Sequence, residues 1–187
     1  MLLVPPATNP ISVALSSLAA GRMGISSAYG GSLSEAASVC ISEASHPNPA
    51  CFRVDGHAEI EAKVNWDTPS VEALNTWNDH EFATEQGAYG IAALLVEEFG
   101  LEVVQRSRKG TGFDYWLGPR GKAADLFQGL SRLEVSGIRV GDQTKVAQRA
   151  RIKFKQTAKS DNLALPAVVA IIEFSSPSAL ITERCHT

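Results

Sequence analysis

Two acidic side chains, Asp114 and Glu134, stand in short segments that alternate apolar and polar residues. Alternation places Asp114 opposite the apolar residues of segment 113–117, and it places Glu134 on the same face as Ser136. If the two segments pair as neighbouring strands, the two carboxylates converge. Carboxylate oxygens are the ligands that a hard cation such as Mg²⁺ prefers, and such an ion activates water and neutralises a phosphodiester oxygen.

Positive charge gathers near these acidic residues. Residues 141–160 carry a net charge of +5, whereas the whole chain has a formal net charge of −3. Such asymmetry suits the recognition of phosphates. The alternative is that the basic helix is an ordinary solvated face and that the two carboxylates are ordinary surface residues. The cations that would contact nucleic acid are Arg108 and Lys109 before Asp114, and Arg149 and Lys153 on one face of a predicted helix.

The elements that must position these residues follow an α/β order with a mixed sheet. Apolar residues recurring every three or four positions predict helices, and short alternating or continuous apolar runs predict strands. In chain order we expect a helix at 84–99, strands at 101–107, 113–117 and 130–138, a helix at 143–160, and a strand buried on both faces at 165–174.

This pattern resembles the restriction-endonuclease-like, or PD-(D/E)XK, nuclease superfamily, whose core is a helix, three strands, a helix and a strand. Asp114 follows a glycine-bearing turn, as the family's aspartate does, and Glu134 matches its acidic residue on the third strand. The resemblance implies Mg²⁺ or Mn²⁺ held by Asp114 and Glu134, with Glu85 of the first helix as an auxiliary ligand. The family's lysine should stand where this chain has Ser136. Diverged members carry a substitute on the following helix, so Lys145, the nearest to the strand, is the expected water-positioning base.

Two functions are therefore open. The first is a Mg²⁺-dependent nuclease, by resemblance of a bacterial restriction or anti-phage type, with Asp114, Glu134 and Lys145 as catalytic residues. The second is a catalytically inactive subunit that binds nucleic acid or a protein partner in a larger assembly. In that case the N-terminal segment and the basic helix would contact the partner.

Residues 1–50 are rich in Gly, Pro, Ser and Ala, unlike the rest of the chain. We expect them to form an N-terminal helical arm, with short helices at 11–20 and 33–42, attached to an α/β domain of residues 51–187. That domain is expected to open with a β-hairpin of strands 51–54 and 58–64 around Asp55-Gly56, followed by a short helix at 71–77.

Composition excludes several other classes of protein. With 44% hydrophobic and 20% charged residues the chain is typical of globular proteins, and no apolar stretch is long enough to span a bilayer. Three cysteines do not form a secreted disulfide scaffold, and the apolar stretch 13–20 lacks the basic residues that begin a signal peptide, which favours a cytoplasmic protein. The chain contains no nucleophile elbow, P-loop or H-E-x-x-H motif, and its Cys and His spacing does not match zinc sites.

Overall fold

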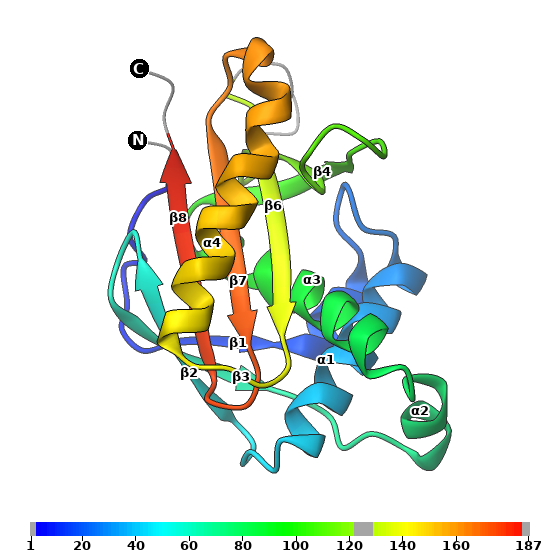
Figure 1. The fold of residues 1–187 in the computed structure, drawn as a ribbon. Helices are drawn as coiled ribbons and strands as arrows, with labels where there is room; N and C mark the ends of the chain where they lie inside the picture. Colours follow the sequence, from blue (N-terminus) through cyan, green and yellow to red (C-terminus); the bar gives the residue numbers. More distant parts are fainter. Residues whose placement is uncertain (1–2, 122–128, 185–187) are drawn as a thin grey trace.

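The computed structural model describes residues 3–121 and 129–184 of the chain. Within these residues, a single mixed eight-stranded sheet has the order β1-β3-β2-β8-β7-β6-β5-β4 and is flanked by helices (Figure 1), so the predicted α/β class is confirmed. The strands are β1 (Ile11–Ala14), β2 (Ala50–Gly56), β3 (Ile60–Asn65), β4 (Leu101–Arg106), β5 (Tyr115–Pro119), β6 (Ser131–Ile138), β7 (Ala167–Glu173) and β8 (Ser178–Arg184). The α-helices are α1 (Ser27–Glu43), α2 (Val71–Thr76), α3 (His80–Glu98) and α4 (Gln143–Thr157), with 3-10 helices η1 (Leu15–Ala20) and η3 (Ala158–Leu163).

The half of the sheet that carries the predicted site runs from α3 to β7. Strands β4, β5 and β6 pair antiparallel in succession, and β7 lies parallel to β6. A parallel pair needs a crossover connection, which α4 provides on one face of the sheet while α3 packs on the other (Figure 1). The chain order in this half is a helix, three strands, a helix and a strand, as the sequence predicts.

The two faces of the sheet bury different amounts of apolar surface. Under α1 and α3 lies a large core, to which β7 contributes Val168, Ala170 and Ile172. Under α4 lies a small cluster made of Ile138, Val146, Ala150, Val169 and Ile171. Strand β7 is therefore buried on both faces, as its continuous apolar run predicts.

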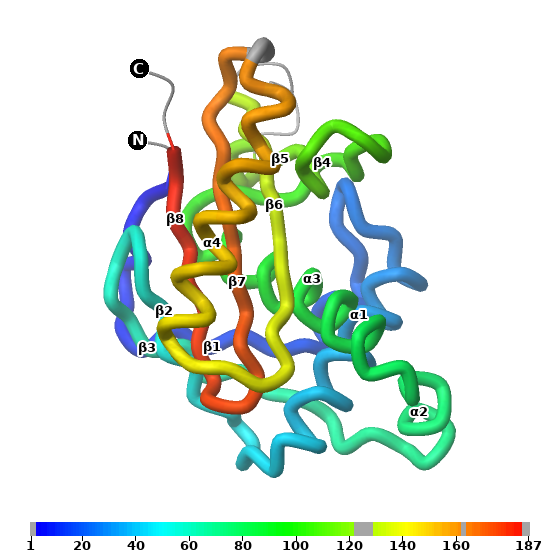
Figure 2. The backbone as a smooth tube through the Cα atoms, viewed as in Figure 1, coloured from blue at the N-terminus to red at the C-terminus, as the bar shows by residue number. Residues whose placement is uncertain are grey.

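The predicted helix at residues 11–20 is wrong. This segment forms β1 and then η1, and β1 pairs in parallel with β3 at the edge of the sheet. Ile11 and Val13 are buried while Ser12 is exposed, which is the alternation of buried and exposed side chains typical of a strand. The segment adopts this conformation because β3 is available as a partner. The tube in Figure 2 shows this N-terminal segment lying beside β3.

The second helix predicted in the N-terminal segment exists but is longer. Helix α1 begins at Ser27, and its N-cap Ser26 accepts a hydrogen bond from the backbone of Tyr29. It packs closely on α3, because small residues such as Gly87 leave room for the backbone at Ala37. The described residues of the first fifty thus share one apolar core with the rest of the sheet.

The hairpin and the short helix α2 are confirmed, and strand β8 was not predicted. Asp55 and Gly56 belong to β2 rather than to the turn, because Gly56 pairs with Ile181 of β8. A side chain at Gly56 would overlap the carbonyl oxygen of Ile181, so the close approach of these strands needs glycine there. No described helix is long and apolar enough to cross a membrane.

Candidate functional site

Asp114 lies at the point where β5 parts from β6. The two strands pair only over Ser131–Leu133 of β6, and the backbone N–H of Asp114 donates to the carbonyl of Leu133 at 2.8 Å. Its Oδ2 accepts from the backbone N–H of Val135 at 2.9 Å, where the carbonyl of a continuing strand would otherwise lie. Beyond this point no strand of the described residues pairs with this edge of β6.

Glu134 follows on β6, with its side chain on the face that α4 covers. It is 5% exposed, and the ammonium of Lys153 donates to its Oε1 at 2.6 Å. Burial raises the pKa of Glu134 to about 7; repulsion by Asp114 and a hydrogen bond with that carboxyl add to the rise, and Lys153 opposes it. The two carboxyl groups therefore lie together, and one of them holds a proton more tightly than a free glutamate.

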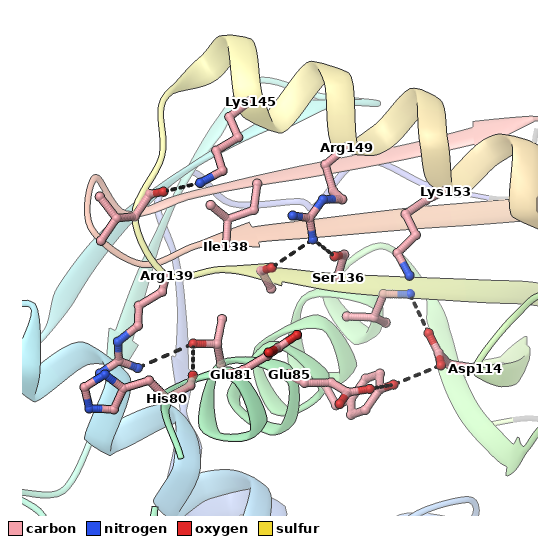
Figure 3. Close-up of a pocket in the computed structure, with 15 residues that line it drawn as sticks. His80, Glu81, Glu85, Asp114, Ser136, Ile138, Arg139, Lys145, Arg149 and Lys153 are labelled. Carbon is pink, nitrogen blue, oxygen red and sulfur yellow. Dashed lines mark hydrogen bonds between the residues drawn. The ribbon is translucent and has the colours of Figure 1, made fainter. Parts of the chain in front are cut away.

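Three of the cations of α4, namely Lys145, Arg149 and Lys153, lie at different places along β6 (Figure 3). Lys145 donates to the carbonyl of Val140 at 2.7 Å, Arg149 donates to Ser136 Oγ at 2.8 Å, and Lys153 reaches Glu134. Helix α4 returns antiparallel over β6, so its first turn lies at the far end of the strand and its last turns lie beside the carboxyl groups. Lys153, rather than the expected Lys145, is the lysine placed at the acidic pair.

Glu85 contacts Asp114 only through Tyr89. The Tyr89 hydroxyl lies 2.8 Å from Glu85 Oε1 and 2.9 Å from Asp114 Oδ1. Burial and the two neighbouring carboxylates raise the pKa of Tyr89, so its hydroxyl keeps its proton. Tyr89 is not among the predicted site residues, although its spacing offers a signal: Tyr89 follows Glu85 by four positions, and such residues are neighbours on a helix.

Two adjoining cavities form what we call the β6 groove. One has a volume of about 650 Å³ and lies between α3, the open edge of β6 and α4; the other, of about 480 Å³, lies beside the turn that follows β4. Both are lined by Glu85, Tyr89, Asp114 and Lys153, so Asp114 and Lys153 stand at their junction, and Glu134 lines the second cavity. Lys145 and Arg149 line the first cavity, and Arg106, Arg108 and Lys109 line the second. Cations thus flank the carboxyl groups on both sides.

The donor set suits a divalent cation only to a limited extent. Among residues 3–121 and 129–184, no three His, Cys, Asp or Glu side chains lie close enough together to hold a metal ion, so Glu85 is not gathered with the other two carboxyl groups. Asp114 and Glu134 do fit the chemistry, because a divalent cation between them would offset the repulsion that raises the pKa of Glu134. Water or phosphate oxygens would have to complete the coordination.

Comparison with protein-family models, with curated proteins and with solved structures finds no match for this chain. The function must therefore be inferred from the chemistry of the β6 groove.

Proposed function

We propose that the protein is a metal-dependent nuclease with a restriction-endonuclease-like core. The observation that carries the proposal is the meeting of Asp114, Glu134 and Lys153 in a groove with cations on both sides. The order of elements from α3 to β7 supports the fold assignment, because it is the order that the resemblance implies.

In this proposal Asp114 and Glu134 hold Mg²⁺ or Mn²⁺. The ion, when bound, supplies an activated water and neutralises charge on the phosphodiester. Lys153 takes the role of the motif lysine, because it reaches Glu134 from α4 over the same face of β6 that Ser136 occupies. Its ammonium positions the attacking water and offsets negative charge at the reacting phosphate.

The cations along the groove bind the substrate backbone. Arg149 lies on one side of the acidic pair, and Arg108 and Lys109 lie on the other. Contacts of this kind go to phosphates, so they contribute affinity that depends on salt but not on sequence.

One observation favours a second candidate. Glu134 is already paired with Lys153, and the position of the motif lysine is held by Ser136, whose hydroxyl accepts from Arg149. A catalytically inactive subunit that only binds nucleic acid would show the same contacts.

A cleavage assay with a matched pair of variants tests the proposal. The purified protein is incubated with supercoiled plasmid, single-stranded DNA and RNA in Mg²⁺ or Mn²⁺, with and without a chelator. We expect chelator-sensitive cleavage that Lys153→Met lowers by about 10²-fold or more, the size of effect typical of a group that assists proton transfer or charge development. Lys155→Met is the control, because it makes the same change on the same helix at an exposed residue that lines neither cavity, and it should retain cleavage.

The other outcomes separate the candidates. Salt-dependent binding without cleavage of any substrate favours the inactive subunit. Absence of both cleavage and binding contradicts both candidates, and equal losses in the two lysine variants would remove Lys153 from the site.

A further inference from the structure

Asp114 is held from two sides. Val135 donates its backbone N–H to Oδ2, and the Tyr89 hydroxyl lies 2.9 Å from Oδ1. Because both oxygens are fixed, the plane of the carboxylate is fixed as well. A phenol carries one proton, so Tyr89 shares a single donor between Asp114, which directly precedes β5, and Glu85 on its own helix α3.

The Tyr89 ring is itself held firmly. It is 4% exposed, and the Arg106 guanidinium stacks 4.8 Å from the centre of the Tyr89 ring and 4.8 Å from that of Tyr115. Arg106 also donates to the hydroxyls of Tyr115 at 2.7 Å and of Tyr29 at 3.1 Å. Side chains from α1, β4 and β5 therefore fix the ring whose hydroxyl meets Asp114.

The tyrosine hydroxyls of this cluster have no part in the nuclease mechanism described above. Arg106 stacks on the Tyr89 ring and donates to the other two tyrosines, and its charge also interacts with Asp114. Among the side chains of the cluster, Tyr89 is the one that hydrogen-bonds to Asp114 and Glu85. Supporting groups that orient a metal ligand in this way commonly change metal affinity or activity by about 10- to 100-fold when they are removed.

We propose that Tyr89 is a positioning residue for Asp114, held in place by the cluster of Arg106, Tyr115 and Tyr29. Its hydroxyl sets the direction of Asp114 Oδ1 and keeps the Glu85 carboxylate apart from it. This inference rests on the proposed function in that it takes Asp114 to be a metal ligand.

Tyr89→Phe and Tyr115→Phe form a matched pair for the test. Each removes one hydroxyl from a buried ring and keeps the stacking with Arg106, but only Tyr89 touches the carboxylates. We expect Tyr89→Phe to weaken Mn²⁺ binding in calorimetry and to lower kcat by about 10- to 100-fold, with KM for an oligonucleotide unchanged. Tyr115→Phe should change each quantity clearly less than Tyr89→Phe does, because its hydroxyl supports the Tyr89 ring only through Arg106. Equal losses in the two variants, or a loss confined to KM, would overturn the proposal.

A metal-free measurement separates this inference from the nuclease proposal. Urea denaturation midpoints are compared for the wild type, Tyr89→Phe, Asp114→Ala and the double variant. If the hydroxyl holds Asp114, the shift caused by Tyr89→Phe is smaller in the Asp114→Ala background than in the wild type. The same shift in both backgrounds would disprove the link even in an active enzyme. A wild-type protein that neither binds Mn²⁺ nor cleaves would overturn the nuclease proposal, whereas this cycle would still decide the Tyr89–Asp114 contact.

Discussion

The two faces of the sheet differ in what they bury. The face under α1 and α3 is filled with aliphatic and aromatic side chains from distant segments of the chain. The face under α4 has a five-residue apolar cluster and, next to it, the side chains of Glu134 and Ser136. Helix α4 is correspondingly polar, and of its residues only Val146, Ala150 and Thr157 are buried.

This difference shows how one small domain accommodates both a stable core and buried charge. An ionised group is costly to bury among apolar side chains unless it is paired. On the thinly packed face, Glu134 can be buried because Lys153 lies beside it and the groove stays open to water. Stability and chemistry should therefore respond to different substitutions.

The largest effect on stability should come from the face under α3. Ile171 and Ile172 are adjacent on β7, both are fully buried, and they point to opposite faces. We expect Ile172→Ala to destabilise by about 4 kcal/mol and Ile171→Ala by about 2 kcal/mol, since the smaller cluster can collapse more easily around the lost atoms. Urea denaturation measures both values. Equal losses would mean that the two faces are packed alike.

The next effect concerns the acidic pair and metal. If Asp114 and Glu134 bind one divalent cation, Mg²⁺ or Mn²⁺ at a hundredfold excess over Kd should stabilise the protein by about 2.7 kcal/mol. Asp114→Asn should remain folded and lose this increment, because the amide keeps the volume and lacks the charge. Thermal unfolding at several metal concentrations measures the effect. An identical metal response in the wild type and the variant would exclude Asp114 from the site.

A further effect should appear in the dependence of stability on pH. The folded-state pKa of Glu134, about 7, lies above its ordinary value of 4.5, so the folded protein binds this proton more tightly than the unfolded chain does. Stability from this group is therefore present at low pH and is lost as pH rises from about 4.5 to about 7. Glu134→Gln should flatten that region of the profile in metal-free buffer. A variant whose profile stays as steep as that of the wild type would contradict the raised pKa.

The smallest effect should be on the salt dependence of nucleic-acid binding. Lys109→Gln removes one charge from the second cavity of the β6 groove, so the slope of log K against log salt should fall by about 1. Lys63→Gln on β3 is the control, because it changes the same charge outside the groove. Fluorescence anisotropy at several salt concentrations measures both slopes. A fall of equal size in the control would show that only the net charge matters.

Local periodicity was enough to predict the order of elements from α3 to β7. The apolar run of β7 and the alternation around Glu134 are signals contained within a few residues. By contrast, β1 forms at residues whose composition also suits a helix, because pairing with the distant β3 decides their conformation. Strand β8 was not predicted for a related reason. It lies in the sheet because it pairs with β7 on one side and with the distant β2 on the other.

The candidate site shows the same limit. Asp114 and Glu134 could be proposed from two neighbouring strands, but the choice among the lysines of α4 could not. Lys145 is closer to Glu134 along the chain, whereas the antiparallel return of α4 brings Lys153 to the carboxyl group. Tyr89 gains its position from contacts with Arg106 of β4 and Tyr115 of β5, which no single stretch of sequence contains.

The open edge of β6 has a consequence for the behaviour of the protein in concentrated solution. An unpaired strand edge is a template on which a strand of another molecule can add, and charged side chains along such an edge discourage that addition. Here the edge is recessed between α3 and α4, and Arg149 reaches the carbonyl of Gly137 at 3.5 Å. The cation proposed to face phosphates thus also protects the sheet against growth between molecules, and neutralising it should make the protein more prone to aggregate.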